Sequence, residues 1–433
     1  MNLSPPFKAG LRACCGLAVL VVLALSSLWL ADLQRDPAAI RAAVGQAFQD
    51  HRLGDGEGVE RFGLHRASHF SECVGLSTAI LPKAANALWF TLESPALLWQ
   101  PPKPMCESLR DAVGGQAEQP YFAYSRYWHG YRLLTEPALS FLSYGSLQSL
   151  CSLLLGVAAL GVIASAVMPG RSTRWTIRSL AAPCAGLLFL SATVDWQAIA
   201  RMPTHAVSMA VLLLCWAFAM LPRPSERSGL DTALPAAFLM GAVYNFFDFL
   251  YNPDLLAFLL GWSFFMRAVP GRALRPALSG AVAVQVIAIV GYMAMWAAKW
   301  ALVRIGGDLL AEKTFMPTQD FNRWIAGGEQ AYVPFKASYA LLVESTRMPL
   351  GWWPLAACAV VLCALLASAV LRRRSAGVLA VTALALFPLF LLELKANHTF
   401  MHAAFTFRFV PFALILTTIG AALALRRESA ARP

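Results

Sequence analysis

The chain alternates along its whole length between apolar stretches and short polar connections. A membrane helix takes about 20 mostly apolar residues, and about ten stretches come near that length. We expect helices at Leu11 to Leu30, Leu147 to Met168, Ser179 to Val194, Val207 to Leu221, Leu234 to Phe247, Leu255 to Met266, Ala277 to Ala298, Leu350 to Leu371, Val378 to Leu392 and Phe409 to Leu425. The pattern predicts an all-α polytopic membrane protein with a single integral membrane domain over residues 1–433.

Positive charges mark every second connection between these helices. Lys and Arg of short loops are retained on the cytoplasmic side. They occur here as Lys8, Arg12, Arg171, Arg174, Arg178, Arg223, Arg227, Arg267, Arg272, Arg275, Arg372, Arg373, Arg374, Arg426 and Arg427. We therefore expect both chain termini in the cytoplasm, with all seven histidines and nearly every acid on the outer side. The net charge of +11 reflects this topology, so no nucleic-acid partner is expected.

Two connections on the outer side are long, Asp32 to about Ser140 and Val303 to about Pro349. In the first, Pro37 to Gln49 and Cys73 to Phe90 have helical apolar spacing. We expect juxtamembrane helices against the bilayer rather than an independent β-domain. The first helix is interpreted as a retained anchor, with a cleaved signal peptide as the alternative.

The cysteines support the same sidedness. Of nine, seven lie inside apolar helices, where buried thiols are ordinary packing residues. Cys73 and Cys106 are the remaining two, and both fall in the first outer loop. An isolated pair outside the cytoplasm predicts a disulfide rather than a metal site.

Polar residues gather in four groups at the outer membrane boundary. In the first, a helix through His65, His69 and Glu72 would place these three side chains on one face. Glu72 is then a candidate general base with His69 beside it. A solvated loop helix is the alternative interpretation.

The second group is the segment from Tyr124 to Tyr131. An interfacial aromatic belt explains its tyrosines and tryptophan. It does not explain Arg126 and His129, and an arginine beside aromatic faces suits a phosphate or a sugar. We take Arg126, His129 and Tyr131 as candidate binding residues.

The third group interrupts the short fifth and sixth helices, which alternatively form a hairpin. It comprises Asn245, Asp248, Asn252, Pro253 and Asp254. Carboxylates beside a broken membrane helix are costly unless they are paired or hydrated, so they mark functional sites. Asp248 is the better candidate because Asp254 can serve as a helix cap. Asp195, at the end of the third helix, is a similar but less specific candidate.

The fourth group precedes the last helix and includes Asn397, His398, His402 and Arg408. The two histidines are four residues apart, a spacing compatible with two metal ligands. Binding of substrate or of neighbouring groups is the favoured interpretation, and a divalent cation is left open. Arg408 lies near the apolar boundary, where a guanidinium requires an acidic partner or a lipid phosphate.

The arrangement resembles the GT-C superfamily of polyprenyl-phosphate-dependent glycosyltransferases. The likeness rests on the many membrane helices, the long first outer loop and the polar residues at the outer leaflet. It also rests on three motifs, which resemble those of poorly characterised bacterial membrane proteins with GT-C-like architecture: Tyr124 to Tyr131, Phe246-Phe-Asp-Phe-Leu-Tyr-Asn-Pro253, and Asn397-His-Thr-Phe-Met-His402 followed by Phe405-Thr-Phe-Arg408.

The resemblance implies inverting transfer of a sugar from a polyprenyl-phosphate lipid to a hydroxyl of a glycan or other acceptor. It further implies a multi-pass protein of the bacterial inner membrane whose site faces outward. One departure concerns the base: such enzymes place a carboxylate just after the first helix, where this chain offers Asp32 and Asp36, expected to be without polar company. Glu72 and Asp248 are therefore the catalytic candidates.

Two other functions remain open. A transporter or flippase also uses broken helices and intramembrane charge. The sequence Trp128-His-Gly is similar to the histidine motif of membrane-bound O-acyltransferases. No Walker motif or dinucleotide-binding fingerprint is present, and this argues against an ATPase or a redox enzyme.

Overall fold

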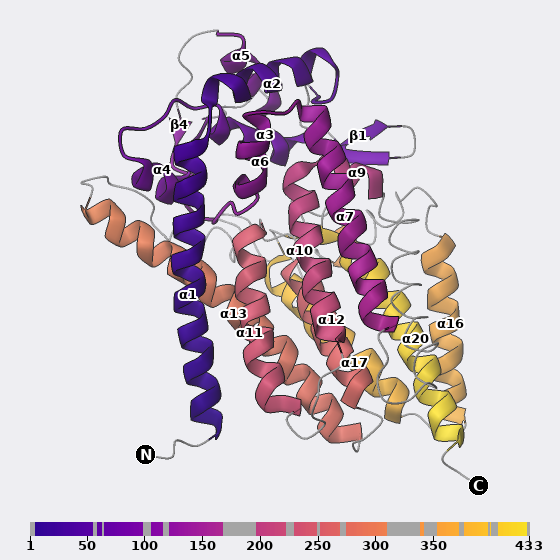
Figure 1. Cartoon of the computed structure of the whole chain (residues 1–433). Helices are drawn as coiled ribbons and strands as arrows, with labels where there is room; N and C mark the ends of the chain where they lie inside the picture. The colour runs from indigo at the N-terminus through magenta and orange to yellow at the C-terminus, as the bar shows by residue number, and fades with distance from the viewer. Residues whose placement is uncertain are drawn as a thin grey trace.

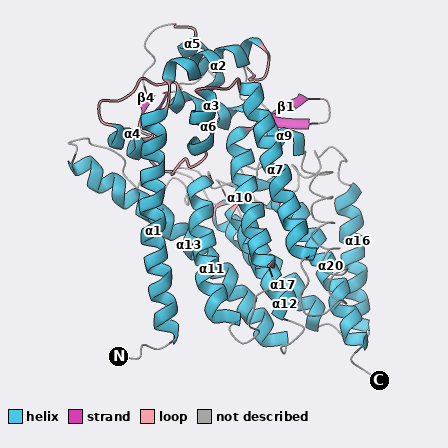
Figure 2. Cartoon of the chain, viewed as in Figure 1, coloured by secondary structure: helices cyan, strands magenta, loops and turns pink. Residues whose placement is uncertain are grey.

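The structure is a computed structural model. It describes residues 5–54, 59–62, 65–97, 105–115, 121–167, 196–221, 229–248, 252–268, 274–309, 338–341, 353–371, 376–396, 399 and 406–430. Helices dominate these residues, and the strands form only two short ribbons (Figure 2). The expected all-α class is confirmed at this level.

The long helices form an elongated bundle. They are α1 (Pro5–Gln34), α7 (Tyr144–Val167), α10 (Pro203–Met220), α11 (Gly229–Phe247), α12 (Pro253–Ala268), α13 (Leu274–Leu309), α16 (Trp353–Leu371), α17 (Ala376–Leu394) and α20 (Phe409–Ala430). Among the described residues, six helices are long and apolar enough to cross a membrane: α1, α7, α10, α11, α13 and α17. The chain is thus a membrane-embedded helical protein. The helix expected at Ser179 to Val194 lies outside the described residues.

The two ends of the bundle differ. The start of α1 and the end of α20 lie at one end, and the helices of the first outer loop cover the other (Figure 1). Arg12 near the start of α1, Arg267 near the end of α12 and Arg275 near the start of α13 belong to the first of these ends. These three arginines therefore lie at the end of the bundle away from the helices of the first outer loop.

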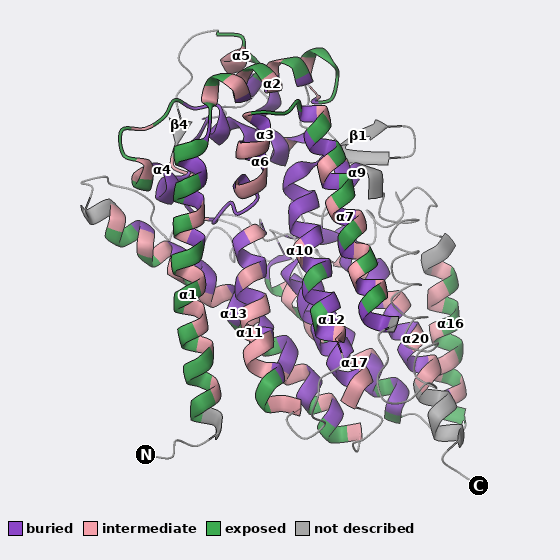
Figure 3. Ribbon diagram, in the orientation of Figure 1, coloured by how far each residue is buried: buried purple, intermediate pink, exposed green. Residues whose placement is uncertain are grey.

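Burial distinguishes inner helices from outer ones (Figure 3). α10 and α12 are largely buried, whereas α1 and α16 expose much of their surface. Much of the exposed surface of the outer helices is apolar, for example Val22 at 62%, Leu153 at 64% and Val360 at 68% exposed. Such a surface is stable against lipid rather than water.

Two glycines let α11 and α13 pack closely. A Cβ added at Gly241 would overlap the carbonyl oxygen of Ala288, and one added at Gly291 would overlap that of Phe238. Small residues at a helix crossing allow such backbone contact in membranes. The backbones of α11 and α13 are therefore in direct contact beside α12.

We call residues 35–140 the cap. It contains α2 (Pro37–Gln49), α3 (His69–Ala79), α4 (Ala87–Glu93), α5 (Met105–Val113) and α6 (Arg132–Leu139), with strands β1 (Val59–Phe62), β2 (His65–Ser68), β3 (Ala96–Leu97) and β4 (Tyr121–Phe122). Strand β1 pairs with β2 and β3 with β4, both antiparallel. The short α9 (Trp196–Arg201) precedes α10. The expected helices at Pro37 to Gln49 and within Cys73 to Phe90 are present, and no independent β-domain occurs among the described residues.

Local signals define several cap elements. Asp36 accepts hydrogen bonds from the backbone N–H groups of Ala38 at 3.0 Å and Ala39 at 3.2 Å, and Pro37 is the first residue of α2. Both are strong helix-start features. The predicted disulfide is confirmed, because Cys73 on α3 is bonded to Cys106 on α5.

Two expectations about helix limits were wrong. His65 begins strand β2, and α3 begins only at His69, so the stretch from His65 to Glu72 is not one helix. Residues 65–68 pair with β1 as a β-strand instead of forming the first turn of a helix. In addition, α13 continues to Leu309, beyond Val303 where the second outer loop was expected to begin.

Candidate functional site

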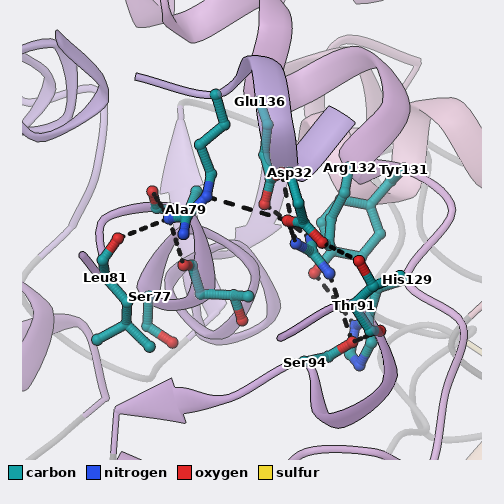
Figure 4. Close-up of polar contacts among 12 residues, drawn as sticks. Asp32, Ser77, Ala79, Leu81, Thr91, Ser94, His129, Tyr131, Arg132 and Glu136 are labelled. Atoms are coloured by element: carbon teal, nitrogen blue, oxygen red, sulfur yellow. Dashed lines mark hydrogen bonds and ion pairs between the residues drawn. The ribbon is translucent and has the colours of Figure 1, made fainter. Parts of the chain in front are cut away.

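Four charged side chains are buried together where α1 enters the cap. Figure 4 shows Asp32, Arg132 and Glu136 among them. We call Asp32, Arg35, Arg132 and Glu136 the Asp32 cluster. Arg132 donates one hydrogen bond to Asp32 and another, from Nε at 2.7 Å, to Glu136 Oε1. The four residues are between 0 and 4% exposed. Opposite charges in this setting are stabilised by one another because water is excluded.

Neighbouring groups complete the cluster. Thr91 donates its hydroxyl hydrogen to Asp32 Oδ2 at 2.5 Å. Arg35 Nη1 donates to the carbonyl oxygen of Ala79, the last residue of α3, at 2.9 Å and to that of Leu81 at 2.6 Å. Its guanidinium lies 4.2 Å from the centre of the Phe90 ring. The cluster therefore joins α1, α3, α4 and α6.

The expectation that Asp32 has no polar company was wrong. Its partner Arg132 is distant in sequence, so spacing near the first helix does not reveal it. Burial alone would lower the pKa of Arg132, but the carboxylates of Glu136 and Asp32 outweigh it and hold that pKa above its ordinary value. Asp36, by contrast, is exposed and serves as the N-cap of α2.

Glu72 lies in the first turn of α3 and is 1% exposed. Its Oε1 accepts a hydrogen bond from the Thr204 backbone N–H at 3.0 Å and another from the Thr204 hydroxyl. Burial raises the pKa of Glu72 to about 7, although the bonds from Thr204 oppose the shift. A carboxyl with such a pKa exchanges protons readily near neutral pH.

Asp248 is also buried, at 2% exposed, and follows α11. Its Oδ1 accepts from the Ser208 hydroxyl at 3.0 Å, and its Oδ2 accepts from the Tyr292 hydroxyl at 3.1 Å. Ser208 lies four residues after Thr204 on α10, so the two hydroxyl residues share one face of that helix. One turn of α10 thus holds both predicted catalytic carboxylates.

The segment from Tyr124 to Tyr131 approaches Glu72 through its last residues. His129 Nε2 lies 2.9 Å from the Tyr124 carbonyl oxygen, and His129 Nδ1 lies 3.3 Å from the Tyr131 hydroxyl. A carbonyl only accepts, so Nε2 carries the hydrogen and Tyr131 donates to Nδ1. Burial lowers the pKa of His129 well below its ordinary value, which keeps the ring neutral. Tyr131 also packs closely over Gly75 of α3, three residues after Glu72.

The same segment is docked onto the membrane bundle. The Trp128 indole N–H donates to the Met295 carbonyl oxygen at 2.9 Å, and the Gly130 N–H donates to that of Phe246 at 2.8 Å. Trp128 is 0% exposed and Tyr131 2% exposed. An interfacial aromatic belt would face lipid, so that interpretation is wrong for these two residues.

Arg126 is half-buried within this segment. Its carbonyl oxygen accepts hydrogen bonds from the indole N–H groups of Trp296 and Trp300 of α13. Its guanidinium lies 5.5 Å from the centre of the Tyr124 ring. The Arg126 guanidinium thus lies beside an aromatic ring, an arrangement that can bind a phosphate or a sugar.

The other predicted residues are distributed around these centres. His69 Nδ1 accepts the Gly54 backbone N–H at 2.5 Å, and Arg408 is 4% exposed just before α20. Asp254, in the first turn of α12, forms a buried ion pair with Lys395 at 2.5 Å. Asp195, Asn397, His398 and His402 lie outside the described residues.

The groups that bind the buried carboxylates were not predicted from the sequence. Arg132 and Glu136 are four residues apart, the spacing of an ion pair on a helix, and this was an available signal. Thr204 and Ser208 have the same spacing but lie in an apolar helix, where hydroxyls usually bond to the backbone. Within the described part of the chain, no three His, Cys, Asp or Glu side chains are placed to hold a metal ion. Comparison of the chain with protein families, with characterised proteins and with solved structures found no match.

Proposed function

We propose that this protein is a membrane glycosyltransferase of GT-C type. It moves a sugar from a polyprenyl-phosphate lipid to an acceptor hydroxyl, and Glu72 is the general base. The observation that carries the proposal is the buried Glu72 carboxyl with a pKa of about 7, held by Thr204 beneath the cap. A general base is most efficient when its pKa lies near the working pH.

The proposed reaction is a single displacement at the anomeric carbon of the donor sugar. The acceptor oxygen attacks the anomeric carbon of the sugar while its proton passes to Glu72. The bond between the anomeric carbon and the phosphate oxygen breaks, and its electron pair leaves with the polyprenyl phosphate. Inversion follows from attack opposite the leaving group. Glu72 is 1% exposed, so the acceptor reaches it only when the cap moves relative to α10.

Arg126 is the proposed group for the donor phosphate. It is half-buried, and two indole N–H groups fix its backbone. A guanidinium binds phosphate oxygens through paired hydrogen bonds and stabilises the negative charge on the departing phosphate. Asp32 is a less suitable base because Arg132 already neutralises its charge.

The proposed topology places the cap outside. The basic residues at the start of α1 and near the ends of α12 and α20 lie opposite the cap, and the positive-inside rule assigns their side to the cytoplasm. The disulfide in the cap fits an oxidising compartment. In a bacterial inner membrane, Glu72 would then face the periplasm.

The test is donor consumption by the purified protein in nanodiscs. A panel of polyprenyl-phosphate sugars is supplied with an acceptor extract, and the lipids are followed by mass spectrometry. Glu72→Gln tests the base, Asp248→Asn tests the second carboxylate, and Glu107→Gln is a control with a partly exposed carboxyl on α5.

We expect release of free polyprenyl phosphate by the unaltered protein and by Glu107→Gln. Glu72→Gln should release it about 10²- to 10⁴-fold more slowly, the usual cost of losing a general base. Full turnover by Glu72→Gln would remove Glu72 from the mechanism. Donor lipids that stay intact throughout would overturn glycosyl transfer and favour transport or acyl transfer.

A further inference from the structure

The junction between α11 and α12 has buried oxygen atoms without hydrogen-bond donors. Among the described residues, Asn245 Oδ1 and Asn252 Oδ1 have no hydrogen-bond partner, although the two residues are only 3% and 5% exposed. A buried amide oxygen without a donor is unfavourable and indicates a ligand or ordered water. These two oxygens lie on opposite sides of the same break between membrane helices.

Asn252 shows most clearly that a buried side-chain oxygen has no hydrogen-bond donor among the described residues. Its carbonyl oxygen accepts the Leu256 N–H at 3.2 Å, so Asn252 is at the N-cap position of α12. An asparagine there normally uses its side-chain oxygen to accept a backbone N–H of the first turn. Here the side-chain oxygen accepts no hydrogen bond from the described residues. Capping therefore does not explain this side chain.

Asp248 adds a charge to the same junction. It lies three residues after Asn245, which places both on one side of the end of α11. Its two oxygens accept hydrogen bonds from the hydroxyls of Ser208 and Tyr292, and Tyr244 supplies a third. Two carboxylate oxygens have about four lone pairs, so acceptor capacity remains for an ion. The C-terminal end of α11 also carries partial negative charge, which favours a cation.

Charge balance indicates the class of ligand. Asp254 is ion-paired with Lys395 at 2.5 Å, so that carboxylate is already neutralised. Lys395 also acts electrostatically on Asp248. Two ionised carboxylates and one ammonium group still leave one negative charge among these three residues. Amide and carboxylate oxygens are hard ligands suited to hard cations, and ends of broken membrane helices bind Na⁺ in this way.

We infer that the α11–α12 junction is a binding site for a monovalent cation such as Na⁺, with Asn245, Asp248 and Asn252 as ligands. The ion satisfies the two amide oxygens and compensates the charge of Asp248. It thereby joins the end of α11 to the start of α12. The inference is independent of glycosyl transfer and is tested without any sugar substrate.

The experiment measures thermal unfolding of the purified chain in nanodiscs by tryptophan fluorescence. NaCl replaces N-methylglucamine chloride at constant ionic strength, so that general screening does not change. A bound ion stabilises the fold with a saturable dependence on its concentration. Uptake of radioactive Na⁺ by the unaltered protein measures the same binding directly and does not depend on any variant folding.

Asn245→Leu and Asn252→Leu remove the amide oxygens while keeping the number and branching of the side-chain heavy atoms. Gln285→Leu is the matched control, because Gln285 is 0% exposed, has an Oε1 without a hydrogen-bond partner among the described residues, and lies beside Gly261, two turns along α12 from the junction. We expect the half-saturating Na⁺ concentration to rise about tenfold or more in the first two variants, as for loss of an ion ligand, and to stay unchanged in Gln285→Leu.

Three outcomes would overturn the inference. The first is identical unfolding in Na⁺ and N-methylglucamine together with no uptake of radioactive Na⁺, which would assign the oxygens to water. The second is a response to Mg²⁺ or Ca²⁺ without any response to Na⁺. The third is an equal loss of the Na⁺ response in Gln285→Leu.

Discussion

Asp32, in the last turn of α1, is ion-paired with Arg132, the first residue of α6, although the two residues are 100 positions apart. The pair is buried and shares Glu136 as a second acid. It fixes the end of the first membrane helix to the cap at a point where the chain leaves the membrane. A movement of the cap would therefore also move the end of α1.

Removal of the Asp32 charge should destabilise the fold. In Asp32→Asn the buried Arg132 keeps only Glu136 as an acidic partner, and loss of one partner from a buried ion pair costs about 3–5 kcal/mol. Asp36→Asn is the control, because Asp36 is exposed and asparagine is an equally good N-cap. Chemical unfolding in detergent measures both, and equal stabilities would contradict a stabilising role for the cluster.

Substitutions of Glu72 should separate its structural contact from its chemistry. Met202, the N-cap residue of α10, makes no side-chain capping bond, and Glu72 accepts the Thr204 N–H in its place. Gln keeps an accepting oxygen, whereas Ala leaves the helix end unpaired at a cost of about 1 kcal/mol or more. Glu72→Gln should therefore be folded and inactive, and Glu72→Ala both less stable and inactive. An active Glu72→Gln protein would show that capping is the whole role of Glu72.

The raised pKa of Glu72 also predicts how stability varies with pH. The ordinary value is 4.5 and the folded value about 7, so the fold binds a proton more tightly than the unfolded chain does. Protonated Glu72 stabilises the fold fully below pH 4.5, and this stabilisation is lost as pH rises through 7. The free energy of unfolding changes by about 3 kcal/mol over this range. The free energy of unfolding of the unaltered protein should fall across this pH range, whereas that of Glu72→Gln should not show this fall. A flat difference would place the Glu72 pKa near its ordinary value.

The membrane helices and the disulfide could be predicted from the sequence because each depends on a local or a countable signal. Apolar length predicts a span, and α10 and α17 follow the expected limits closely. Cys73 and Cys106 are the pair outside apolar helices, so their bond required no knowledge of the fold. The prediction failed at His65, where a short hairpin replaces the helix.

The partners of the carboxylates could not be predicted for a physical reason. Glu72 bonds to Thr204, 132 residues away, and Asp248 bonds to Ser208, 40 residues away. Such contacts depend on helix packing, and no periodicity in one segment encodes them. Burial of Trp128 was missed in the same way, since an aromatic segment near a membrane boundary has the same composition whether it faces lipid or protein.

Loss of the Cys73–Cys106 bond should loosen the cap. The bond joins α3 to α5 across a sequence separation of 33 residues, and native disulfides of this kind contribute about 2–5 kcal/mol. The double variant Cys73→Ala with Cys106→Ala should unfold at lower temperature, with Cys151→Ala in α7 as a control for a buried free thiol. Mass spectrometry of the unaltered protein from its native membrane should find Cys73 and Cys106 oxidised. Free thiols there would contradict both the bond and the outward placement of the cap.

Gly130→Ala should displace the segment that carries Arg126 and His129. An added Cβ would lie 2.5 Å from the Phe246 carbonyl oxygen, which is also the acceptor for the Gly130 N–H. That atom belongs to the backbone of α11 and cannot rotate away, so the segment must shift and lose this hydrogen bond. Overpacking of this kind costs about 1–3 kcal/mol.

The control is Gly156→Ala in α7, where an added Cβ meets nothing within 4 Å. Alanine in a helix interior is favoured over glycine by about 1 kcal/mol, so this variant should be as stable as the unaltered protein or more so. The rate of protease cleavage at Arg126 and the temperature of unfolding are measured for Gly130→Ala and Gly156→Ala. Accelerated cleavage in Gly130→Ala alone would show that docking on α11 holds Arg126 in place, whereas unchanged cleavage would mean that its two indole contacts suffice.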